Sequence, residues 1–107
     1  MNRIILIALA TVFATPAVAA GDVASGREKA KTCAACHGPD GNAPISPDFP
    51  RLAGQHYDYL LKALRDYKSG ARKNPIMAGQ VVNLKPRDMA DLAAFYANQK
   101  GALHVVR

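Results

Sequence analysis

Apolar residues follow a helical period in three segments of the chain, with little sign of strand alternation. The strongest segment covers residues 56–69, where one stripe of an amphipathic helix is formed by Tyr57, Leu60, Leu61, Leu64 and Tyr67. Residues 86–98 follow, with Pro86 at the first helical position and an apolar face of Met89, Leu92, Ala93 and Tyr96. Residues 21–31 form a shorter candidate, in which Gly26 would let another helix approach closely. The pattern predicts an all-α fold.

Two segments between these helices are expected to be long loops. Residues 38–54 contain too many prolines for a helix or an interior strand, at Pro39, Pro44, Pro47 and Pro50. Residues 70–82 separate the second and third helices. Long loops in a small domain usually indicate function or disorder.

The first 20 residues are typical of a secretory signal peptide. Arg3 precedes an apolar run over residues 4–14, and small residues follow. Cleavage is expected after Ala20, with Ala19 as the alternative, so that residues 21–107 form the mature domain. The run is too short for a membrane span, which needs roughly 20 apolar residues, although an uncleaved anchor is the rival interpretation. We expect export to an oxidising space such as a bacterial periplasm.

The remaining 87 residues make one domain whose core is marginal unless something else fills it. Loss of Arg3 lowers the formal charge from +6 to +5, which suggests steering toward an acidic partner surface. The basic residues are scattered, without a run or interleaved aromatic residues. Nucleic acid is therefore not an expected partner.

Candidate chemistry is concentrated in Cys33-Ala34-Ala35-Cys36-His37, which holds both cysteines of the chain. A thioredoxin-like pair would need strands, and a structural zinc site would need two more ligands, for which only His56 and His104 remain among the histidines. A disulfide in so short a loop would remove little chain entropy. Covalent haem attachment uses two thiols about one helical turn apart, with an imidazole next to the second. A haem would also supply the missing core.

Further motifs extend this signal along the chain. They are Phe49-Pro50-Arg51-Leu52-Ala53-Gly54-Gln55, Tyr59-Leu60, Gly70-Ala71-Arg72, Pro75-Ile76-Met77 and residues 84–96. Together with the cysteine motif they closely resemble class I cytochromes c, in the small soluble bacterial branch called cytochrome c-553-like, also seen as the repeated half of two-haem relatives. This chain has one attachment motif. The resemblance implies the cytochrome c fold, three main helices and long loops wrapped around one covalently attached haem c.

The resemblance also implies roles for residues near the haem. Cys33 and Cys36 would carry the two thioethers, and His37 would be the proximal iron ligand. The Pro50 carbonyl would accept the other ring proton of that histidine, and Leu52 would pack on the haem ring. Gln55 and Arg72 are possible propionate contacts. Gly26 would lie where the first and last helices cross, near Phe95 and Tyr96.

Met77 is the expected distal ligand, because the family places its methionine in this second loop. His56 or an open distal site are the alternatives, and Met89 is better explained as core.

With both axial positions filled, the implied function is a periplasmic one-electron carrier between respiratory redox partners, not an enzyme. It would be a monomer or a weak complex, with an exposed haem edge and with Lys29, Lys31 and Arg51 as candidates for steering. The competing functions are a haem enzyme or gas-binding protein with an open site, and a docked subunit of a larger oxidoreductase.

Overall fold

Five helices build the domain in the computed structural model, which describes residues 4, 5, 7–11 and 21–101. They are α1 (Val23–Lys29), α2 (Ala34–His37), α3 (Tyr57–Ser69), α4 (Pro75–Val81) and α5 (Pro86–Ala97). No strand occurs among the described residues, and the all-α prediction is confirmed. The expected cleavage positions at Ala19 and Ala20 and the histidine His104 lie outside these residues. No described helix is long and apolar enough to cross a membrane.

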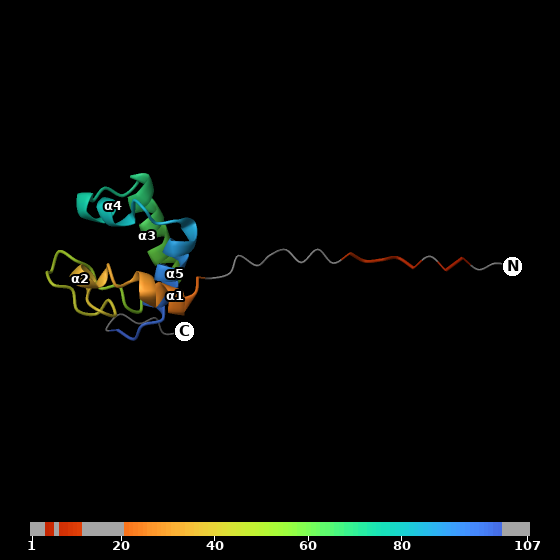
Figure 1. The fold of residues 1–107 in the computed structure, drawn as a ribbon, viewed down its shortest axis with the longest axis horizontal. Helices are drawn as coiled ribbons and strands as arrows, with labels where there is room; N and C mark the ends of the chain where they lie inside the picture. The colour runs from red at the N-terminus through yellow and green to blue at the C-terminus, as the bar shows by residue number, and fades with distance from the viewer. Residues whose placement is uncertain (1–3, 6, 12–20, 102–107) are drawn as a thin grey trace.

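Helix α5 is the centre of the packing. It contacts both α1 and α3, while α4 contacts α3 (Figure 1). Every residue of α5 from Asp91 to Tyr96 is buried. The core cluster joins α5 to the end of α1 and to one residue of α3, through Ala30, Leu60, Leu92, Ala93, Phe95 and Tyr96. Because six consecutive residues are buried, this part of α5 is more apolar than a single stripe requires.

The crossing of α1 and α5 leaves no room for a side chain at Gly26. A Cβ atom there would lie 2.0 Å from the backbone oxygen of Asp91 and 2.7 Å from the Cβ atom of Phe95. The close approach predicted for Gly26 is confirmed. Any larger residue would push the two helices apart, because protein cores are packed too densely to absorb the added volume.

A buried carboxylate ties the same two helices together. Asp91 is 1% exposed, and its Oδ1 atom accepts hydrogen bonds from the Asp22 backbone amide at 2.7 Å and from Arg87 Nε at 3.0 Å. Its Oδ2 atom accepts from Lys29 Nζ at 2.5 Å. Burial alone would raise the pKa of Asp91, but the hydrogen bonds and charges of these partners outweigh it and hold the pKa below its usual value. The carboxylate therefore stays ionised inside the domain.

Residues 70–82 are not the continuous loop that we expected, because they contain α4. Asn74 caps this helix, since its Oδ1 atom accepts from the amides of Ile76 at 3.0 Å and Met77 at 3.1 Å. Pro75 follows at the first helical position, where its missing N–H removes no hydrogen bond. The Asn-Pro pair was a helix-start signal. The helix has only seven residues and contains Gly79, so its periodicity was too weak to reveal it.

The other helices match the prediction to different degrees. Helices α3 and α5 lie within one residue of the predicted ends. Helix α1 is shorter than residues 21–31, because Asp22 caps it by accepting a hydrogen bond from the Ser25 amide at 3.0 Å, and because a turn follows Lys29. This turn redirects the chain into α2, which carries the candidate chemistry.

We expect Asp91→Asn to destabilise the domain by about 2 kcal/mol or more, because it weakens a buried, charge-assisted network. The pKa of Asp91 is depressed in the folded state, so its contribution is present above about pH 4 and is lost as the pH falls through the folded pKa. The difference in the free energy of unfolding between wild type and variant should therefore become smaller in acid. Urea unfolding at several pH values measures it.

Glu28→Gln is the matched control for this experiment. Glu28 pairs with Lys31 at 2.6 Å, but both side chains are mostly exposed. Such a surface pair contributes about 0–1 kcal/mol. An equal loss of stability in the two variants would contradict the structural role assigned to Asp91.

Candidate functional site

Helix α2 is a single turn that presents the two cysteines together. The His37 amide donates to the Cys33 carbonyl at 3.1 Å, and the Gly38 amide donates to the Ala34 carbonyl at 3.0 Å. Residues three positions apart face the same side of such a turn, so Cys33 and Cys36 lie near each other. Both are half-buried and neither forms a disulfide. Gly38 ends the turn with a φ of 86°, which favours glycine.

His37 is buried at 5% exposure and is held in one orientation. Its Nδ1 atom lies 2.9 Å from the Pro50 carbonyl oxygen, which can only accept, so Nδ1 carries the proton and donates. The Phe49 ring meets the imidazole edge to face, with centroids 6.1 Å apart. Only Nε2 remains available as a ligand atom. The contact expected for Pro50 is present, and Phe49, which immediately precedes it, was missed.

Gly41 anchors the loop that carries Pro50 to helix α5. Its carbonyl accepts from the Leu52 amide at 2.9 Å, while the Gly54 amide donates to the Tyr96 carbonyl at 2.9 Å. Gly41 has a φ of 81°, and a Cβ atom there would lie 2.8 Å from the ring of Tyr96. The loop can follow this path only with glycine at position 41.

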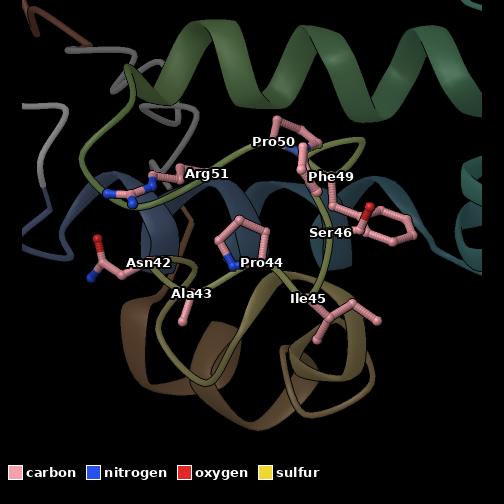
Figure 2. A pocket seen from close by; sticks show the side chains of 9 residues that line it. Asn42, Ala43, Pro44, Ile45, Ser46, Phe49, Pro50 and Arg51 are labelled. Atoms are coloured by element: carbon pink, nitrogen blue, oxygen red, sulfur yellow. The ribbon is translucent and has the colours of Figure 1, made fainter.

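An open hollow of about 850 Å³ lies on the inner side of the same loop (Figure 2). It is lined by Asn42, Ala43, Pro44, Ile45, Ser46, Pro47, Phe49, Pro50 and Arg51. Phe49 and Pro50 belong both to this lining and to the surroundings of His37. The hollow and the histidine therefore form one region of the molecule.

The apolar stripe of α3 is only partly covered by protein. Leu60 is its one fully buried residue. Other apolar side chains pack against the core but stay half-buried, among them Leu52, Tyr57, Leu61, Leu64 and Leu84. Leaving so much apolar surface uncovered is costly for a small domain, and a large apolar cofactor would cover it.

Tyr96 adds a polar atom to this apolar region. Burial raises the pKa of the Cys33 thiol, and burial together with the neighbouring Cys33 raises the pKa of the Tyr96 hydroxyl. Within the described part of the chain, this hydroxyl is the buried side-chain polar atom that lacks a hydrogen-bond partner. Periodicity had assigned Tyr96 to the core, and nothing in the pattern distinguished its hydroxyl.

The candidate distal residues lie in different environments. Met77 is half-buried on α4, which Figure 1 shows at the other end of α3 from the loop that follows α2. Met89 is 4% exposed in the core, as predicted. His56 is exposed and precedes the first residue of α3. Among the described residues, no three histidine, cysteine or acidic side chains gather where they could hold a metal ion.

The predicted surface residues differ in their contacts. Lys29 is not a free surface charge, because it is bound to Asp91 and lies 2.9 Å from Asp88, and these hydrogen bonds raise its pKa. Lys31 pairs with exposed Glu28, whereas Arg51 is exposed and forms no ion pair with any described residue. Gln55 donates to the Arg51 carbonyl, and the Arg72 guanidinium lies 4.8 Å above the Tyr67 ring.

Comparison with known proteins identifies the site. The cytochrome c family model matches residues 23–100. The chain belongs to the cytochrome c family. Haem c is its covalent cofactor, and Cys33 and Cys36 occupy the attachment position of the family's cysteine motif. The buried imidazole with one free nitrogen, the paired free thiols and the uncovered apolar stripe fit such a group.

Relatives and a solved structure agree with this family. Cytochrome c4 of Pseudomonas aeruginosa is 50% identical over 101 residues, which cover 94% of this chain and 50% of the relative. Cytochrome c-554(548) of Halomonas halodenitrificans is 40% identical over 84 residues, with 76% and 100% covered. The crystal structure of cytochrome c4 from Pseudomonas stutzeri superposes with a TM-score of 0.73 at 43% identity, covering 78% of this chain and 48% of that chain.

These comparisons confirm a class I cytochrome c with the all-α cytochrome c fold. The relatives named above are cytochromes c4 and c-554(548), a slightly different branch from the c-553-like one that we expected. The chain spans about half the length of the cytochromes c4 that it matches.

We expect haem to remain on the protein after denaturation and acidic solvent extraction, because thioethers survive both treatments. Mass spectrometry of the denatured protein should show the mass of one haem on the chain. The double variant Cys33→Ala, Cys36→Ala should lose this mass completely, while Thr32→Ala, at the exposed neighbouring position, should keep it. A covalent haem in the double variant would contradict the assignment of these cysteines.

Proposed function

We propose that residues 21–107 form a periplasmic one-electron carrier, exported by cleavage of residues 1–20, with His37 and Met77 as the axial ligands of its haem iron. The observation that carries this proposal is the buried His37, whose Nδ1 atom is committed to the Pro50 carbonyl at 2.9 Å. A ring fixed in this way offers Nε2 in one direction. Such hydrogen bonds orient an imidazole ligand and raise its basicity.

The chain's own residues have separate tasks in this proposal. Cys33 and Cys36 hold the cofactor, while Pro50 and Phe49 orient the histidine. Leu52 and the half-buried stripe of α3 exclude water from the haem faces. Gln55 and Arg72 are proposed contacts of the propionates. Haem supplies the one-electron chemistry, and the protein supplies position and environment.

Met77 lies on α4, whose start is fixed by the two hydrogen bonds to Asn74. A thioether ligand stabilises ferrous iron and raises the reduction potential relative to a second imidazole. With His37 and Met77 as ligands, no coordination position would remain for a substrate. This ligand set favours a carrier over a haem enzyme or a gas-binding protein.

We propose redox proteins with acidic docking surfaces as partners of this basic domain. Arg51 is the best steering candidate, because it is exposed, unpaired among the described residues and part of the hollow beside His37. Lys31 is a weaker candidate because it pairs with Glu28. Lys29 is no longer proposed as a steering residue, because its ammonium group is paired with the buried Asp91.

Met77→Ala should open the distal position. The far-red charge-transfer band between sulfur and iron should disappear from the oxidised spectrum, the reduction potential should fall, and carbon monoxide should bind the reduced variant. Wild-type protein should keep the band and exclude carbon monoxide. Optical spectra in both redox states measure all three properties, when combined with a potentiometric titration.

His56→Ala and Met89→Leu are the controls for the distal ligand. Both should retain the far-red band, because His56 is exposed and Met89 belongs to the core. If Met77→Ala kept the band while one control lost it, the distal ligand would be reassigned. Readily bound carbon monoxide in the wild type would instead favour the enzyme or gas-binding function.

Arg51→Gln should slow electron exchange with an acidic redox protein about twofold at low ionic strength, because one steering charge is lost. The difference should vanish at high salt, where exposed charges are screened within a few ångströms. Lys62→Gln is the control, since Lys62 is engaged with Asp66 on α3. Stopped-flow rates at several salt concentrations provide the measurement, and equal effects of the two variants would contradict steering by Arg51.

A further inference from the structure

Tyr96 brings a phenol into the apolar layer between α5 and the first cysteine of the motif. The residue is 4% exposed, and its hydroxyl makes no hydrogen bond within the part of the chain that the structure describes. A buried hydroxyl without a partner destabilises the folded state. An unpartnered hydroxyl in a core that is otherwise apolar indicates a hydrogen bond whose geometry is completed only when the cofactor is attached.

The ring of Tyr96 is fixed from several directions. It packs closely over Gly41, and the Phe95 ring meets it edge to face, with centroids 5.0 Å apart. Its backbone carbonyl accepts from the Gly54 amide at 2.9 Å and from the Gln99 amide at 3.2 Å. A ring held in this way cannot turn its hydroxyl toward solvent.

Cys33 packs against the core cluster that contains Tyr96. The Cys33 thiol and the Tyr96 hydroxyl lie close enough for each to affect the ionisation of the other, in addition to the larger effect of burial. In the free chain both groups carry a hydrogen, so either can donate. A thioether sulfur has lone pairs but no hydrogen, so after attachment the phenol is the only possible donor of the pair, and the sulfur is a weak acceptor.

We propose that Tyr96 is a positioning residue whose hydroxyl donates a hydrogen bond to the Cys33 sulfur in the haem-loaded protein. The bond holds the thioether in one rotamer. It would also draw electron density from a sulfur bonded to a haem side chain, which would favour the reduced state, since hydrogen bonding around a haem is one of the means by which proteins tune its potential. The inference rests on Cys33 as a haem cysteine and is independent of the distal ligand.

Tyr96→Phe tests the proposal because it removes only the hydroxyl. If the hydroxyl has no acceptor in the loaded protein, phenylalanine should make the holoprotein more stable. If it bonds the sulfur, the unfolding equilibrium constant of the variant should rise roughly fivefold and its reduction potential should fall. Tyr59→Phe, at an exposed tyrosine on α3, is the control and should leave the potential unchanged.

A second measurement needs no variant. In proton NMR of the reduced wild-type holoprotein, the Tyr96 hydroxyl proton should exchange slowly with water and show a nuclear Overhauser effect to the Cys33 β protons. Covalent haem is verified by mass on the same sample, which separates a failure of attachment from a failure of this hydrogen bond. A Tyr96→Phe holoprotein that is more stable than wild type at an unchanged potential would overturn the proposal, as would rapid exchange of the hydroxyl proton.

Discussion

The contact between α1 and α5 at Gly26 is the constraint on which the rest of the domain depends. The backbones approach so closely that a single added carbon would lie 2.0 Å from a carbonyl oxygen. Asp91 then joins the two helices through the Asp22 amide and Lys29. Because α5 also carries Tyr96, the position of this crossing determines where the loop with Pro50 is held, and therefore how His37 is oriented.

The domain therefore has one side that is fully packed and another side whose apolar surface is only partly covered. The α1–α5 side is dense, and its one buried carboxylate has its hydrogen-bond partners within the chain. The side formed by α2, its following loop and the α3 stripe is half-buried and apolar, and the Tyr96 hydroxyl has no hydrogen-bond partner among the described residues. Small domains often need a metal or cofactor to complete their core. The packing within the protein is therefore complete on the α1–α5 side, whereas the side that would contact haem lacks part of its apolar cover.

Sequence reasoning found those features that repeat or that use rare residues. Helices α3 and α5 were located through their apolar period, and the cysteine motif was recognisable because both cysteines fall within four positions. Helix α4 was missed because it begins with a cap and a proline but carries little apolar periodicity. Lys29 was assigned to the surface because its partner Asp91 lies 62 positions away. The unpartnered state of the Tyr96 hydroxyl also depends on tertiary packing, which local pattern does not contain.

The anchoring of the proximal loop on α5 has a consequence for the order in which the domain assembles. Cys33 lies early in the chain, but the buried part of α5 against which it packs, from Asp91 to Tyr96, is synthesised much later. Until those residues are made, α1 lacks the helix that it packs against and the Cys33 thiol remains open to solvent. A chain made in this order keeps the first cysteine of its attachment motif accessible until the last helix forms, and the packing of that helix then covers it.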